Sequence, residues 1–200
     1  RPRFVAPYLL SCDFQEHMLS RASLAIAVVL LAAFLYVESR PSRYEVARSL
    51  AVTAAPELVY GQLEDLRQFP RWSPWDARDP NLQRTFEGPQ RGPGARLHWR
   101  GNRELGTGTM SITQASPPSG LRYLMVLERP WRATIANDLR VVRATTGATV
   151  TWTVSGELGF WAKLFTLFDA PDRRVGKDLE VGLAKLKALV EDASARSSAR

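Results

Sequence analysis

Histidine, cysteine and lysine are scarce in this chain of 200 residues. There are two histidines, His17 and His98, one cysteine, Cys12, and four lysines among 27 basic residues. A single cysteine excludes an internal disulfide and a zinc site built from thiolates. Outside the N-terminal segment only His98 could serve in a catalytic triad or a histidine-based acid–base pair. We therefore expect no metal ion and no cofactor.

Runs of like charge are also absent, although the formal net charge is +7. The arginines are scattered, and no stretch of Lys and Arg interleaves regularly with aromatics, so the sequence does not indicate nucleic-acid binding. An arginine-rich, solvated surface is one interpretation. The other is that Arg40, Arg43 and Arg48, beside the apolar N-terminal segment, meet anionic lipid headgroups.

The chain does contain one apolar run, Ala22–Val37 (ASLAIAVVLLAAFLYV), with Arg21 and Glu38 at its ends. A spanning helix needs about 20 apolar residues, a length that is reached if Met18–Ser20 also enter the apolar layer. We predict a single-pass transmembrane anchor or signal-anchor over residues 18–40. A cleaved signal peptide and a buried core helix remain alternatives, but the following ESRPSRYE offers no small-x-small cleavage site.

The rest of the chain divides around this anchor. We expect residues 1–17 to be an extension of little structural weight, 43–195 to form one domain, and 196–200 to be a frayed tail. Two signals disagree on the side of the membrane. The arginines after the apolar run favour a cytoplasmic domain, whereas a signal-like start at Met18 favours export. We expect the domain on the extracytoplasmic side.

From Tyr44 onward the pattern predicts a β-rich domain. Alternation predicts a first strand over 44–52, followed by a helix that Thr53 caps and Phe69-Pro70 ends. Turn residues then separate six short strands, which predict an antiparallel meander: 83–87, 96–101, 106–116, 120–128, 132–144 and 148–156. Apolar residues from Val175 to Val190 recur with helical spacing and predict an amphipathic helix of about 20 residues, with Asp172 as its cap.

Five sequence words stand in this order: ARSLAVTAAPELVYGQLEDLRQFPRWSPW, DPN, FEGPQRGPGARLHWRGNRELGTGTMSIT, TVTWTVSGEL and GKDLEVGLAKLKALVE. Over roughly Tyr44 to Glu191 the chain closely resembles the SRPBCC, or START-like, superfamily and its polyketide cyclase/dehydrase-type group. The resemblance implies an α+β helix-grip fold. In that fold a curved antiparallel sheet wraps a long C-terminal helix and leaves a deep cavity. Members include lipid carriers, hydrophobic-ligand sensors, co-chaperone-like domains and a few enzymes.

The candidate site is a set of large apolar side chains on elements that should face this cavity. In the fold that the resemblance implies, core and pocket wall overlap, so plain packing is the alternative for each residue. The cavity candidates are Trp72, Trp75, Trp99, Met110, Tyr123, Trp152, Phe160, Phe165 and Leu183.

Polar candidates are weaker. If Trp99 faces the cavity, strand alternation turns the neighbouring His98 toward solvent. The carboxylates Glu104, Glu128, Asp138 and Glu157 lie in or beside strands without any sign of convergence, so we interpret them as solvated. Gly106-Thr-Gly108 lies inside a predicted strand and indicates a bend or bulge, not a phosphate loop.

We therefore predict a membrane-anchored domain that binds a hydrophobic small molecule or lipid between the sheet and the C-terminal helix. The missing histidine–acid set favours a binder without catalysis over the alternative, a cyclase- or dehydratase-like enzyme acting on a bound apolar substrate. A protein-interaction domain with a filled core is a third, weaker interpretation. The expected partners are the apolar ligand and the membrane.

Overall fold

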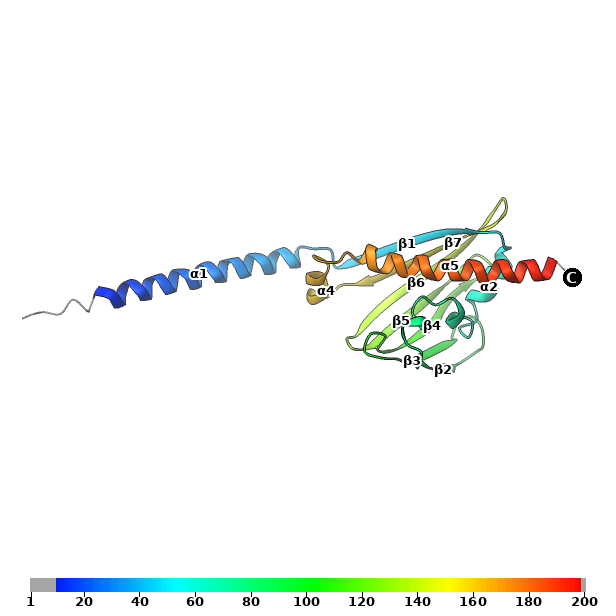
Figure 1. Ribbon diagram of the computed structural model, residues 1–200, viewed down its shortest axis with the longest axis horizontal. Helices are drawn as coiled ribbons and strands as arrows, with labels where there is room; N and C mark the ends of the chain where they lie inside the picture. Colours follow the sequence, from blue (N-terminus) through cyan, green and yellow to red (C-terminus); the bar gives the residue numbers. More distant parts are fainter. Residues whose placement is uncertain (1–9, 199–200) are drawn as a thin grey trace, which may run out of the picture.

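A computed structural model describes residues 10–198 of the protein. A seven-stranded antiparallel sheet curves around a long C-terminal helix (Figure 1). The strands begin and end within one residue of the predicted bounds: β1 Arg43–Val52, β2 Gln83–Glu87, β3 Arg96–Arg100, β4 Thr107–Ser116, β5 Gly120–Arg129, β6 Ala133–Ala144 and β7 Gly147–Glu157. The α+β fold and the meander are thereby confirmed.

The sheet order is β1-β7-β6-β5-β4-β3-β2. Strands β2 to β7 follow one another as hairpins, whereas β1 pairs with β7, from Arg43 opposite Glu157 to Val52 opposite Ala148. The first and last strands are therefore neighbours. The chain crosses from β1 to the far edge through α2 (Pro56–Leu63), α3 (Phe69–Trp72) and the 3-10 turn η1 (Asp76–Arg78).

The prediction of one helix capped by Thr53 is wrong in both respects. Helix α2 ends at Leu63, because the Asp65 carboxylate accepts a hydrogen bond from the Arg67 backbone N–H at 2.9 Å and forms a local turn. Thr53 makes a tertiary contact instead of a cap. Its backbone N–H and its hydroxyl donate to Oε1 of Glu191, at 2.8 and 2.9 Å. Ala55 occupies the N-cap position.

The C-terminal helix, α5 (Pro171–Ser198), is 28 residues long and includes residues 196–198, which we expected to belong to a frayed tail. Asp172 lies within its first turn, so it is not the cap that the sequence predicted. The carboxylate pairs with the Arg48 guanidinium of β1 at 2.9 Å. The predicted burial of the leucine stripe is confirmed, since Leu179, Leu183 and Leu186 are buried.

Before the domain, helix α1 (Leu10–Glu38) extends away from the sheet (Figure 1). Its described side chains are exposed except for Val37. Within the part of the chain that the structure describes, no helix is long and apolar enough to cross a membrane. The transmembrane helix predicted over residues 18–40 is therefore not supported by the described residues.

Candidate functional site

A cavity of about 370 Å³ lies between the concave face of the sheet, the α3–η1 segment and the N-terminal half of α5. Small-molecule pockets in proteins commonly measure about 300 to 1,000 Å³. Most of the wall is apolar and comes from strands β1, β3, β4, β5, β6 and β7 and from α5. The apolar lining consists of Tyr44, Phe69, Trp75, Leu82, Leu97, Trp99, Leu105, Met110, Met125, Leu127, Trp131, Ile135, Val154 and Val175.

Two broader hollows, of about 1,240 and 1,440 Å³, lie along the outer face of the sheet. Charged residues line them, with Arg43 in the first hollow and Glu128 and Arg129 in both. They are open to solvent and lack an apolar interior, so they do not suit a small ligand as the inner cavity does.

Strand alternation explains which side chains reach the cavity. On β3, Leu97 and Trp99 point inward, while His98 lies on the outer face between Thr109 and Glu87. The Trp99 ring lies over Gly108 of β4, where a Cβ atom would come within 2.5 Å of the ring. The sheet register shifts between Thr107 and Gly108, which confirms the predicted bulge. A glycine is needed there because the indole occupies the space of its side chain.

Charged groups gather at one rim of the cavity and neutralise one another. Arg78 pairs closely with Asp178 of α5 and, at 3.3 Å, with Glu104, while Arg84 pairs with Asp76. Burial lowers the pKa of Arg84. Asp178 also accepts a hydrogen bond from the Trp75 indole N–H at 3.0 Å. With Arg174, the lining holds three arginines and three carboxylates, so the cavity has no excess of either charge.

One polar side chain lies deeper in the wall. Asn137 of β6 is only 2% exposed, and its Oδ1 accepts a hydrogen bond from the Trp152 indole N–H at 3.1 Å. A buried amide without partners costs about 1 to 3 kcal/mol. The contact with Trp152 satisfies the carbonyl half of the amide. The amide nitrogen has one long contact, to the Ile135 backbone oxygen at 3.5 Å, and Asn137 is part of the cavity wall.

The structure distributes the predicted cavity residues over three places. Trp75, Trp99 and Met110 line the cavity. Trp72, Tyr123, Trp152 and Leu183 belong instead to the packed core. Burial raises the pKa of the Tyr123 hydroxyl, which stays protonated and donates to the Leu63 carbonyl oxygen of α2.

Phe160 and Phe165 occupy the third place, outside the cavity. Both lie on α4 (Phe160–Phe165), at the end of the sheet beside α1, and Phe165 is 72% exposed. The ring of Phe160 lies 5.2 Å from that of Phe34 of α1. These aromatics face α1 and solvent because β7 ends before α4 begins, so no sheet surface lies beneath them.

The predicted polar candidates do not converge on the cavity interior. His98 bonds through Nδ1 to the Thr109 hydroxyl at 2.9 Å on the outer face. Asp138 pairs with Arg122 at 2.7 Å on that same face. Glu104 lies at the rim with Arg78. Among the described residues no group of three His, Cys, Asp or Glu side chains is placed to hold a metal ion.

The sequence analysis missed Asn137, Arg78 and Asp178. A signal for Asn137 was present, since it occupies the inward phase of its strand between Ile135 and Leu139. A polar residue at an apolar position of a strand marks either a buried hydrogen bond or a ligand contact. No sequence signal brings Arg78 and Asp178 together, because they are 100 positions apart and meet only in the fold.

Solved structures share this architecture at low sequence identity. A protein from Chromobacterium violaceum is 16% identical, with a TM-score of 0.53, over 76% of this chain and 99% of that chain. The Aha1 dimer from Colwellia psychrerythraea is also 16% identical, with a TM-score of 0.52, over 74% of this chain and 96% of that one. The di-domain ARO/CYC StfQ from the steffimycin biosynthetic pathway is 16% identical, with a TM-score of 0.58. That match covers 90% of this chain and 61% of the di-domain chain.

These likenesses establish the fold, and no curated protein matches the sequence. The match to a family model identifies the family as well as the fold. The model described as polyketide cyclase / dehydrase and lipid transport matches residues 43–191, which include every strand, α5 up to Glu191 and the whole cavity wall. Since that match covers well over half of the sequence, the chain belongs to the polyketide cyclase/dehydrase and lipid transport family.

Proposed function

We propose that this protein binds a neutral hydrophobic small molecule or lipid in the cavity between the sheet and α5, and that α1 holds it at a membrane. The observation that carries the proposal is the partly enclosed, mostly apolar cavity of about 370 Å³. Apolar walls with a few placed polar groups are typical of binding sites for such ligands. The paired charges at the rim favour a ligand without net charge.

The same geometry argues against acid–base catalysis in the cavity. His98, the sequence neighbour of the cavity residue Trp99, lies on the outer face of the sheet. The rim carboxylates Asp76 and Asp178 form ion pairs with arginines. A general base must come within hydrogen-bond reach of a bound substrate. The arrangement suits a carrier or sensor, which needs shape and apolar area.

Displacement of a fluorescent apolar dye from the full-length protein in detergent tests the binding function. We expect uncharged lipids and polycyclic ketones to compete, and their charged analogues to compete less well. Trp99→Ala should weaken dye binding, whereas His98→Ala, on the outer face, is the matched control and should leave it unchanged. A protein that binds none of these compounds would contradict the proposal.

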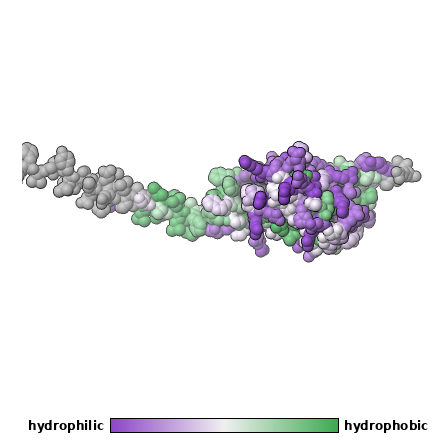
Figure 2. Space-filling model, turned by 90° about the horizontal axis from the view of Figure 1, so that it is seen from below, coloured by the Kyte–Doolittle hydropathy of each residue, from purple (hydrophilic) through white to green (hydrophobic). Residues whose placement is uncertain are grey.

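The membrane attachment rests on the surface of α1 and α4. Leu24, Val29 and Leu30 of α1 are each at least 64% exposed, and Figure 2 shows this apolar helix beside a mostly hydrophilic domain. The end of α1 is held by α4, where the buried Lys163 ammonium contacts the Glu38 backbone oxygen at 3.2 Å and its carboxylate at 3.3 Å.

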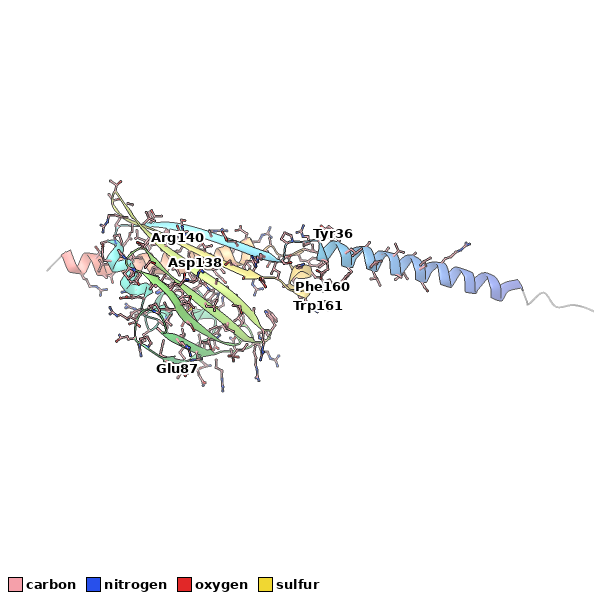
Figure 3. The ribbon with its side chains drawn as sticks, turned by 180° about the vertical axis from the view of Figure 1, so that it is seen from behind. Tyr36, Glu87, Asp138, Arg140, Phe160 and Trp161 are labelled. Atoms are coloured by element: carbon pink, nitrogen blue, oxygen red, sulfur yellow. The ribbon has the colours of Figure 1, made fainter. Side chains whose placement is uncertain are left out.

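Helix α4 and the turn that follows it add an exposed aromatic ridge beside α1. Trp161, Phe165 and Phe168 are 70%, 72% and 84% exposed. In Figure 3, Phe160 and Trp161 lie next to Tyr36 at the domain end of α1. Aromatic side chains concentrate at membrane–water interfaces. The exposed aromatic side chains of the ridge therefore support its contact with a lipid bilayer.

Part of the cavity wall lies at the end of the sheet from which α1 leaves. Trp131, 70% exposed, lines the cavity just before β6 begins. The start of β6 pairs with the end of β7, Ile135 opposite Gly156, and α4 follows β7 directly. We propose that the ligand enters at this end, where the path through water is short, because this part of the cavity wall and the aromatic ridge share one end of the domain.

Carbonate extraction of membranes from expressing cells tests the attachment, and protease protection of sealed vesicles tests our placement of the domain on the extracytoplasmic side. We expect the full chain to stay with the membrane pellet and a chain starting near Ser42 to be released. Trp161→Ser with Phe165→Ser should weaken vesicle binding, while Val142→Ser, an exposed apolar residue on β6, is the control. Release of the full chain by carbonate would contradict the attachment.

A further inference from the structure

The amide of Asn137 is held in one orientation by the core around it. Indole N–H groups only donate hydrogen bonds, so the Trp152 indole at 3.1 Å must face the amide oxygen and not the amide nitrogen. The Trp152 ring cannot turn away, since it packs edge-on against Trp72 and Trp75, with centroids at 5.5 and 6.0 Å. Gly182 of α5 closes the remaining side of the ring. The NH₂ group of Asn137 therefore has a fixed direction.

This NH₂ group carries two donors and is almost without partners. Among the described residues, its one hydrogen-bond contact is the Ile135 backbone oxygen, at 3.5 Å, the outer limit of a hydrogen bond. Asn137 is nonetheless buried, and the cavity wall around it includes Met125, Ile135 and Val154. A donor with one long protein contact thus lies in an apolar part of the cavity wall.

We infer that Asn137 donates a hydrogen bond to an acceptor oxygen of the bound ligand, and that the ligand is an apolar molecule with a neutral carbonyl, as in a ketone, ester or quinone. This inference rests on the proposed binding function. A carboxylate ligand is disfavoured because Arg78 is already paired with Asp178 and Glu104. A hydrocarbon would leave the Asn137 donor unused. An alcohol would accept its hydrogen bond but would also bring a hydroxyl donor that needs an acceptor of its own.

Trp152 is the positioning residue for this contact. It does not line the cavity itself, but it sets which half of the Asn137 amide reaches the ligand. Replacing the indole with a ring that lacks the N–H would let the amide rotate. The ligand would then meet the oxygen part of the time, and the preference for an acceptor would fall.

Titration calorimetry with two matched probes tests the inference on the full-length protein in detergent. Menadione, a neutral naphthoquinone, carries carbonyl acceptors, and methylnaphthalene has the same fused rings without them. The wild-type protein should prefer menadione. Asn137→Leu should reduce that preference roughly three- to tenfold, the range expected for one net hydrogen bond. Met125→Leu, a similar-sized change in the same wall, should keep the preference.

A second variant covers the case in which Asn137→Leu does not fold. Trp152→Phe keeps Asn137 and most of the ring packing, and it should lower the menadione preference while leaving methylnaphthalene affinity nearly unchanged. An unchanged preference in either folded variant would overturn the inference. Equal binding of both probes by the wild-type protein would overturn it while leaving the binding function standing. Binding of neither probe would count against both.

Discussion

The two halves of α5 meet the sheet in different ways. The C-terminal half, from Gly182 to Val190, packs closely, and Leu183, Leu186 and Val190 are each at most 3% exposed. In the N-terminal half, Val175 and Asp178 border the cavity instead. Both halves carry the same apolar spacing, so the helix alone does not decide which half is packed. The difference comes from what lies opposite each half.

Trp152 and α2 fill the space opposite the packed half. Gly182 lets the helix approach Trp152 so closely that a Cβ atom would lie 2.6 Å from the ring. Opposite the N-terminal half lie η1 and the rim ion pairs. The space between them and the sheet is the cavity. One helix thus supplies both stability and a pocket wall, and the following substitutions can separate the two roles.

The largest effect is expected in the packed half. Leu183→Ala should lower the free energy of unfolding by about 2 to 5 kcal/mol, because it removes buried methyl groups and leaves a hole. Val181→Ala, on the exposed face of the same helix, should change it by less than about 0.5 kcal/mol. Urea denaturation followed by circular dichroism measures both. Equal effects would mean that α5 does not close against the sheet.

Substitutions of two glycines, Gly182 in α5 and Gly61 in α2, test how closely α5 packs against Trp152. Gly182→Ala should destabilise the protein by about 1 to 3 kcal/mol, since the methyl group meets the Trp152 ring. Gly61→Ala in α2 has open space around it and should stabilise the protein by about 0.4 to 1 kcal/mol. Thermal denaturation should therefore shift in opposite directions for the two variants. Stabilisation by Gly182→Ala would show that the helix approaches Trp152 less closely than described.

In the cavity half, substitutions should act on binding more than on stability. Trp99→Ala removes one wall of the cavity and should weaken dye binding about tenfold, by loss of about 1.4 kcal/mol of apolar contact. Trp152→Ala, in the core, should instead cost about 3 to 5 kcal/mol of stability. Calorimetry and denaturation on both variants distinguish the roles. A Trp99→Ala protein with full affinity would remove Trp99 from the site.

A smaller effect is expected where α5 meets the start of the α2 segment. Hydrogen bonds from Lys187, and then from the Thr53 backbone, lower the pKa of Glu191 to about 2. Because the unfolded carboxyl titrates near its usual value of 4.5, this contribution to stability is present above pH 4.5. It is lost as the pH falls toward about 2. The difference in denaturation midpoint between the wild-type protein and Glu191→Gln should therefore shrink over that range. A pH-independent difference would contradict this account.

The smallest effect is expected on the outer face. His98→Ala removes contacts to Thr109 and Glu87 without touching the cavity wall. Ligand affinity should stay unchanged, and stability should change by less than about 0.5 kcal/mol. Loss of ligand binding in a folded His98→Ala protein would overturn the assignment of the inner cavity as the site.

The sequence by itself determined the strands and the buried stripe of α5. Period-two alternation and turn residues are local signals, and they located every strand within one residue. The leucine spacing from Leu179 to Leu186 likewise predicted a buried helix face, because a face of that width must be covered. The bulge at Gly108 was also readable, since glycine inside a strand marks a bend or a close approach.

Tertiary structure decided the rest. The pairing of β1 with β7, the place of α4 outside the cavity and the meeting of Arg78 with Asp178 join residues that are far apart in sequence. Aromatic spacing could not say that Trp99 lines the cavity while Trp152 fills the core, since both face inward on their strands. Whether an inward-facing aromatic lines the cavity or fills the core depends on the volume left between the sheet and the helix. No local sequence pattern predicts that volume. The same holds for Asn137, whose amide is oriented by a tryptophan on the neighbouring strand.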